Sequence, residues 1–210
     1  MKKIIYTLSI VLGLGLSANA QIESLAGPRI GAVYMTASPA SNFLNGTLEL
    51  DDMGDLPEDY NDIAKGAFTS LYGWQWESRF ADGYDITGIV EWIVLVGGME
   101  KGKFLPSVSS MVGARTGSGL EFAMGPNLSL GGIAMVFGMG YNFKSGDLNI
   151  PVNIAFVPGR VGKQEGNHQN STRGPDGQWN TDDDVDGYEY DVDYHTGNRF
   201  SITLGFNLGR

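Results

Sequence analysis

The sequence predicts an all-β protein, an eight-stranded antiparallel transmembrane up-and-down β-barrel. Three observations carry this prediction. Bulky apolar residues alternate with small or polar ones in several segments, long and short connections alternate along the chain, and no stretch after residue 20 is apolar for long enough to form a spanning helix. Successive side chains of a strand point to opposite faces, so a period of two indicates strands with one apolar face.

The clearest alternation covers residues 132–157, where two segments of strand length flank a polar turn at residues 144–147. One face of the first segment is bulky and unbroken, whereas the other is small and polar. The bulky residues are Ile133, Met135, Phe137, Met139, Tyr141 and Phe143. A soluble sandwich would bury such a face against a second sheet; a transmembrane barrel would turn it toward lipid and enclose the polar face.

The other strands follow from the same pattern. A first strand is expected over residues 29–37, with Ile30, Ala32 and Tyr34 on one face. In the second, over residues 67–80, one face is aromatic and the other holds Gly73, Gln75, Glu77 and Arg79. The third, over residues 84–96, directs Thr87 and Glu91 inward, although Ile89, Ile93 and Leu95 make its inner face partly apolar.

The remaining strands complete the barrel. The fourth, over residues 104–115, is the least regular; the fifth, over residues 120–130, alternates Leu120 and Phe122 with Glu121 and Ala123. The sixth and seventh are the two segments within residues 132–157. The last, over residues 198–208, alternates apolar residues with serine, threonine, glycine and asparagine. Because the number of strands is even, the first and the last strand have their free ends at the same end of the barrel.

The lengths of the connections separate a barrel from a sandwich. Long connections are expected at residues 38–66, 97–103 and 159–197, the first of them with room for a helical turn; short ones are expected at residues 82–83, 116–119 and 145–147. All the long ones occupy odd positions, and only the connection at residues 131–132 departs from this order. Outer-membrane barrels have short periplasmic turns and longer external loops.

The N-terminal residues indicate where the protein is located, and the distribution of charge indicates which partners it lacks. Lys2 and Lys3, an apolar run to Leu16 and Ala18-Asn19-Ala20 predict a secretory signal peptide over residues 1–20, which leaves residues 21–210 as one barrel domain. The net charge is −10, and residues 176–193 contribute eight carboxylates without a lysine or arginine, so −2 remains for the rest. Without a basic patch, a nucleic-acid partner is not expected.

With these features together, the chain resembles the small outer-membrane β-barrel proteins of Gram-negative bacteria. The resemblance covers the whole chain and includes Trp74-Gln75-Trp76-Glu77, Gly125-Pro126-Asn127, residues 149–153 (NIPVN) and Gly205-Phe206-Asn207-Leu208. It implies fold and outer-membrane location rather than an activity, because most members of this branch have no assigned function. The chain departs from many such barrels by ending in Arg210 instead of an aromatic residue.

An eight-stranded barrel is just wide enough for side chains to fill its interior, so a polar plug is expected. The expected inward residues carry both signs of charge and many amides: Gln75, Glu77, Arg79, Glu91, Arg115, Glu121, Asn127, Asn142 and Asn153. We expect Glu77, Glu91 and Glu121 to pair with Arg79 and Arg115, because unpaired charges surrounded by lipid are costly.

The acidic loop holds the one motif with metal-binding spacing. Asp182, Asp184 and Asp186 stand at positions 1, 3 and 5 of a loop with Gly187 at 6 and Asp193 at 12, which is the spacing of a Ca²⁺-binding EF-hand loop. Aspartate replaces the usual glutamate at position 12, and no flanking helices are expected. A Ca²⁺ site and a solvated acidic loop both remain open; no other cofactor is expected.

We expect the functional work to be structural or surface-interactive and to be done by the loops at residues 38–66 and 159–197. Catalysis is not expected: there is no cysteine, no metalloprotease or serine-hydrolase motif, and only His168 and His195. An outer-membrane lipid-modifying enzyme and a narrow transport channel are the alternatives. The expected partners are outer-membrane lipid, the insertion machinery during assembly and an unknown surface ligand, for a monomer with both termini in the periplasm.

Overall fold

The structure, a computed structural model, describes residues 24–50, 54–57, 60–146, 148–168 and 188–209. The expected signal peptide, residues 1–20, lies outside the described residues. Within those residues, no helix is both long and apolar enough to cross a membrane.

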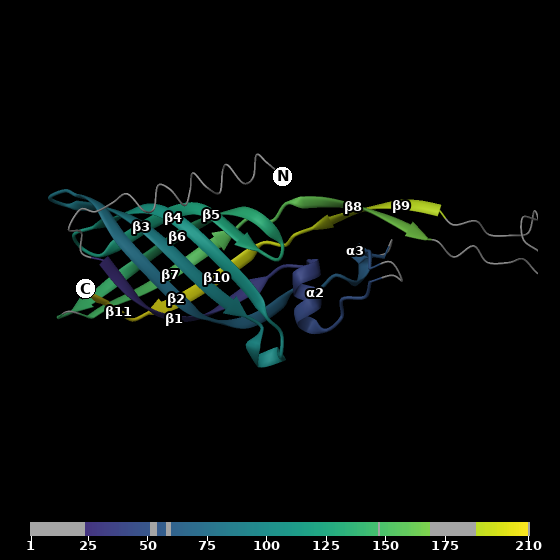
Figure 1. Cartoon of the computed structure of the whole chain (residues 1–210), viewed down its shortest axis with the longest axis horizontal. Coiled ribbons are helices and arrows are strands. Elements are labelled where there is room, and N and C mark those ends of the chain that lie inside the picture. Colours follow the sequence, from purple (N-terminus) through teal and green to yellow (C-terminus); the bar gives the residue numbers. More distant parts are fainter. Residues whose placement is uncertain (1–23, 51–53, 58–59, 147, 169–187, 210) are drawn as a thin grey trace, which may run out of the picture.

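Eight antiparallel strands close into an up-and-down barrel (Figure 1). Each strand pairs with the next in the chain, and β1 closes the ring by pairing with β2 on one side and with the last strand on the other. The strands are β1 (Ser24–Met35), β2 (Ala67–Asp82), β3 (Ile86–Gly97), β4 (Leu105–Thr116), β5 (Leu120–Ser129), β6 (Gly132–Ser145), β7 (Leu148–Val157) and a last strand in two parts, β10 (Arg199–Gly205) and β11 (Asn207–Gly209).

The last strand is interrupted at Phe206, where it lies beside the start of β1. The Phe206 amide donates a hydrogen bond to the Pro28 carbonyl at 3.2 Å. A Cβ on Gly27 would lie 1.8 Å from the Phe206 carbonyl oxygen, so this close approach requires glycine. The barrel therefore closes through a backbone contact that no larger residue would permit.

The two ends of the barrel differ. The turn end has the short connections after β2, β4 and β6, together with the start of β1 and the end of β11. The loop end carries helix α2 (Pro39–Asn45), the short helix α3 (Tyr60–Ile63), the 3₁₀ turn η1 (Met99–Lys101) and a separate hairpin of β8 (Val161–His168) and β9 (Tyr188–His195), which extends beyond the barrel (Figure 1).

The hairpin corrects one expectation. Residues 159–197 were expected to form a long polar loop, yet their described parts pair as β8 and β9. Tyr188, Tyr190, Val192 and Tyr194 do alternate with Glu189, Asp191, Asp193 and His195, but the density of carboxylates hides this period of two. Tyr190 and Val192 are buried against Leu56 and Tyr60, so tertiary packing stabilises strands that charge alone would disfavour.

Side chains of the barrel alternate as the sequence predicts. The outward face is a continuous apolar surface that includes Trp76, 49 % exposed on β2, and Ile202, 53 % exposed on β10. The inward face is buried and largely polar, with Gln75 and Glu77 on β2 at 0 % and 1 % exposed. The closed all-β barrel and its strand order are thus confirmed.

Helix α2 lies over the loop end of the barrel. Ser38 caps it, because its hydroxyl accepts a hydrogen bond from the Ser41 amide at 3.1 Å while the Ser41 hydroxyl accepts one from the Ser38 amide at 2.8 Å. Leu44 is buried with Val33, Met35 and Leu71 of the barrel rim. The helix is therefore fixed to the barrel wall by apolar contact, and it narrows the mouth.

Candidate functional site in the barrel lumen

A layer of charged and amide side chains fills the lumen toward the turn end. We call Arg29, Gln75, Glu77, Glu91, Arg115 and Glu121 the charged layer; all six are buried. At one side of it, Arg115 on β4 binds Glu77 through two parallel hydrogen bonds of 2.6 Å and donates from Nε to Glu121 at 2.5 Å. This bidentate geometry gives strong, directional pairing across three strands.

On the other side of the charged layer, Arg29 of β1 donates hydrogen bonds to the Gln75 side-chain carbonyl and, at 3.3 Å, to Thr203 of β10. The Gln75 amide in turn donates to Glu91 of β3. The two groups together tie β1, β2, β3, β4, β5 and β10 to one another through the interior. Buried arginines and carboxylates joined in this way leave little space for an aqueous path.

The ion pairs of the charged layer agree in part with those that the sequence predicts. Arg115 pairs with Glu77 and Glu121 as expected, and all three predicted carboxylates face inward. Glu91 instead receives its hydrogen bond from Gln75. Arg29 was missed, although the signal was present: it alternates with the outward Ile30 and therefore had to face the lumen.

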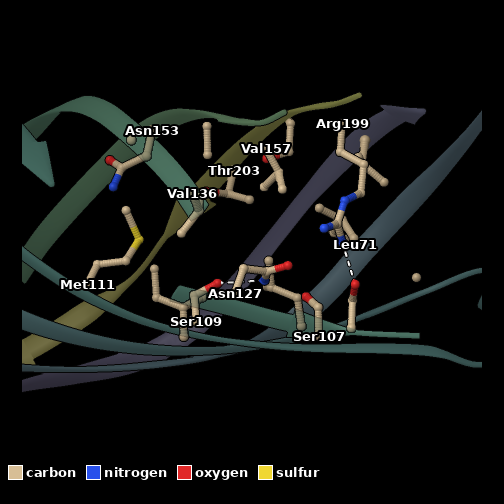
Figure 2. A pocket seen from close by; sticks show the side chains of 18 of the residues that line it. Leu71, Ser107, Ser109, Met111, Asn127, Val136, Asn153, Val157, Arg199 and Thr203 are labelled. Atoms are coloured by element: carbon tan, nitrogen blue, oxygen red, sulfur yellow. Dashed lines mark hydrogen bonds between the residues drawn. The ribbon is translucent and has the colours of Figure 1, made fainter. Parts of the chain in front are cut away.

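Toward the loop end, the lumen contains a cavity of about 120 Å³, the lumen cavity (Figure 2). Its walls are mostly apolar, because the inward residues of β1, β2, β3, β4, β6 and β7 include apolar side chains in this part of the barrel. They include Val33, Leu71, Ile93, Leu95, Met111, Val136 and Val157. Glu91 and Glu121 of the charged layer lie at its floor.

Three buried acceptor atoms of residues that line the lumen cavity have no hydrogen-bond donor within the described part of the chain. They are Asn127 Oδ1, Asn153 Oδ1 and Glu121 Oε2, whereas Asn127 Nδ2 donates to Ser109 at 2.9 Å. Figure 2 shows Asn127, Ser109 and Asn153 around the cavity. A buried acceptor without a donor costs free energy, so these positions favour an occupant such as water that can donate.

Arg199, the first residue of β10, points into the lumen cavity near its mouth (Figure 2). Its Nη1 donates to the Ser129 hydroxyl at 2.8 Å. Within the described part of the chain it forms no ion pair with a carboxylate, in contrast to Arg115. A guanidinium has five N–H donors, so donors remain for an anion at this position.

The lumen cavity continues into a groove outside the barrel. This mouth groove has a volume of about 350 Å³ and lies between α2, the residues that follow it and the β8–β9 hairpin. Leu48, Leu50, Leu56, Phe43 and Tyr194 give it apolar walls. Ala40, Leu105, Leu130, Gly131 and Thr196 line both spaces, so the lumen opens into the groove.

The hairpin and the first loop support each other around the groove. Tyr60 of α3 is 1 % exposed and packs on Tyr190 and Val192, and burial raises the pKa of Tyr60 to about 12, so its phenol is neutral at ordinary pH. The Tyr190 hydroxyl donates to the Leu56 carbonyl at 3.0 Å, and Gln164 donates to Asp55 at 2.5 Å. The loop end is therefore a packed platform.

The predicted calcium loop falls mostly outside the described residues. Asp182, Asp184 and Asp186 lie outside them; Asp193 lies on β9, where its carboxylate is 3.6 Å from the Lys163 ammonium. His168 and His195 are the last residues of β8 and β9, and His195 does not line the lumen cavity. Among the described residues, no group of three or more His, Asp or Glu side chains is arranged to hold a metal ion. Calcium binding by this loop stays a prediction.

Three comparisons with known proteins gave no match: no protein-family model, no curated protein and no solved structure is similar to this chain. The geometry of the lumen and of the loop end therefore carries the functional argument.

Proposed function

We propose that this chain is an outer-membrane barrel protein whose lumen is closed to ions and whose loop end does its work at the cell surface. The observation that carries the proposal is the pairing of an apolar outer wall with a charged, buried interior. Soluble monomers rarely expose contiguous apolar patches of more than a few hundred Å². A transmembrane barrel needs that surface, because it faces lipid.

In this arrangement the start of β1 and the end of β11 lie in the periplasm, and outer-membrane lipid surrounds the barrel as a monomer after the insertion machinery has placed it there. The packed platform of α2, α3 and the β8–β9 hairpin would face outward and meet a surface ligand. A rigid scaffold with longer loops at one end is the usual basis for such binding.

Membrane insertion is tested by refolding the mature chain into phosphatidylcholine vesicles. We expect a folded form that migrates faster than the heated form in electrophoresis and resists extraction by alkaline carbonate. A stable, monodisperse monomer in buffer without detergent or lipid would contradict the proposal.

The closed lumen is tested by conductance in planar bilayers, where we expect no stepwise current from the folded protein. Steady channel currents would favour the narrow transport channel, and turnover of an outer-membrane lipid by the purified protein would favour the lipid-modifying enzyme. Deleting residues 160–196 should abolish any surface-binding phenotype while the barrel still inserts; binding that survives the deletion would place the function elsewhere.

A further inference from the structure

We propose that the lumen cavity and the mouth groove form one binding site for a single-chain amphiphile with an anionic headgroup, such as a medium-chain fatty acid. The carboxylate would bind Arg199, and the alkyl chain would lie along the apolar walls. This inference rests on the proposed membrane location and on the walls of the cavity and groove, and not on whether the platform meets a surface ligand, so ligand binding at the platform and amphiphile binding in the lumen can fail separately.

The first argument is the shape and the lining of the two spaces. The lumen cavity of about 120 Å³ and the mouth groove of about 350 Å³ share five lining residues, and together they reach the size range of small-ligand sites. Aliphatic side chains such as Leu71, Leu95 and Val157 form the walls. A narrow, continuous apolar space of this kind suits a flexible chain better than a compact polar solute.

The second argument is the charge of Arg199. Two of the arginines on the barrel strands have different partners: Arg115 is held by Glu77 and Glu121, whereas among the described residues the hydrogen-bond partner of the Arg199 side chain is the Ser129 hydroxyl. Arginine donors that point into an apolar cavity without a carboxylate favour an anion, because charge-assisted hydrogen bonds are the strong ones.

The carboxylates at the floor of the lumen cavity determine which way the amphiphile lies. Glu91 and Glu121 lie at the floor, and Glu121 Oε2 has no hydrogen-bond donor, so the deep end repels an anion. From Arg199 to Thr203, which also lines the cavity, β10 advances by four residues, roughly 13 Å along the strand. The headgroup therefore belongs at Arg199, with the alkyl chain along the apolar walls of the lumen cavity and the mouth groove and away from these carboxylates.

The test uses the full mature chain in phosphatidylcholine nanodiscs and decanoic acid labelled with ¹³C at its carboxyl carbon. We expect a protein-bound resonance, separate from that of bilayer-dissolved decanoate, which saturates at about one per chain. The bound carboxyl should titrate at a lower pH than the bilayer-dissolved one, because the guanidinium stabilises the carboxylate. Decylamine should not compete for this site.

Two substitutions separate the headgroup from the chain. Arg199→Gln should weaken binding about tenfold or more, whereas Arg160→Gln, an exposed arginine at the same end, should leave it unchanged. Ala155 on β7 lines the lumen cavity, so Ala155→Leu fills part of that space and should abolish the bound resonance. Each variant is first shown to fold by its electrophoretic shift.

Three results would overturn the proposal. One is the absence of a protein-bound resonance in the folded parent protein. Another is binding that folded Ala155→Leu retains in full, which would place the chain outside the lumen. The third is equal affinity of the parent and folded Arg199→Gln, which would remove the anionic headgroup from the assignment.

Discussion

The two halves of the lumen are built on the same eight strands, yet one is filled and the other is hollow. In the turn-end half, long charged side chains meet across the interior, where Arg115 pairs with Glu77 and Glu121. In the loop-end half, aliphatic side chains of the same strands do not reach the centre, and Arg199 has no carboxylate partner among the described residues. In this barrel, therefore, the filled part of the lumen is the part where buried charges pair, although both halves have the same strand number.

The largest expected effect comes from breaking the charged layer. Arg115→Ala leaves Glu77 and Glu121 buried without their partner, which should lower the free energy of unfolding by about 3–5 kcal/mol. The measurement is urea unfolding of the protein refolded in lipid vesicles.

Lys163→Ala is the matched control for Arg115→Ala. Its pair with Asp193 spans 3.6 Å between side chains that are 75 % and 58 % exposed, so its loss should cost less than about 1 kcal/mol. Adding Glu77→Gln and Glu121→Gln to Arg115→Ala should recover part of the loss. Equal costs for Arg115→Ala and Lys163→Ala would mean that the charged layer is hydrated and does not close the lumen.

A smaller effect is expected at the boundary between the two halves. On the inner face of β5, Gly125 lies between Glu121 of the charged layer and Asn127 of the lumen cavity. A Cβ on Gly125 would lie 1.9 Å from the Ser110 carbonyl oxygen, a backbone atom that cannot move aside alone. Gly125→Ala should therefore destabilise the barrel by about 1–3 kcal/mol in the same urea assay.

Gly117→Ala is the control for Gly125→Ala, because its Cβ would meet nothing closer than the Asp85 carbonyl oxygen at 3.8 Å. The β4–β5 pairing is interrupted between Asn127 and Met124, where Pro126 has no N–H to donate. On its other side, β5 pairs with β6 without interruption from Leu120 to Ser129, which limits how far Gly125 can move. If Gly125→Ala left the free energy of unfolding unchanged, this part of the barrel wall could adjust to a larger side chain. Backbone packing would then not determine where the charged layer gives way to the lumen cavity.

Much of this architecture could be predicted from the sequence, because the period of two is a local property. The predicted second and seventh strands match β2 and β7 within two residues at each end, and Glu77, Glu121 and Arg115 lie together as their alternation predicts. The first strand begins at Ser24 instead of Arg29, since Pro28 and Gly27 blur its start.

The lumen cavity and the mouth groove could not be predicted in the same way. Whether Leu71 and Val157 meet or leave a space depends on the diameter and the shear of the closed barrel, which no local pattern specifies. The inward position of Arg199 follows from the alternation of its strand. Whether a carboxylate lies close enough to pair with it depends on which residues the closed barrel places opposite it. The β8–β9 hairpin was hidden for a different reason, because it is stabilised by contacts with residues 56 and 60 across the loop end.

The smallest expected effect concerns a charge at the loop end that lies in water and is not buried in the lumen. Hydrogen bonds from the Ser70 and Thr69 side chains hold the pKa of Glu100 at about 2, below its ordinary value of 4.5. Thr69 donates to Glu100 Oε1 at 2.5 Å, and the Ser70 amide donates to the same atom at 3.0 Å. These contacts join η1 to β2.

Because the folded pKa of Glu100 is depressed, its contribution to stability is fully present above pH 4.5 and is lost as the pH falls toward 2. The increment should stay below about 1 kcal/mol, since the side chain is exposed to solvent. It is measured as the difference between parent and Glu100→Gln in urea unfolding from pH 6 to pH 2, which cancels the titration of the other carboxylates. Ser70→Ala should shrink that difference, because it removes one of the hydrogen bonds to the carboxylate. A difference that instead grows as the pH falls would show that the charged form of Glu100 destabilises the fold.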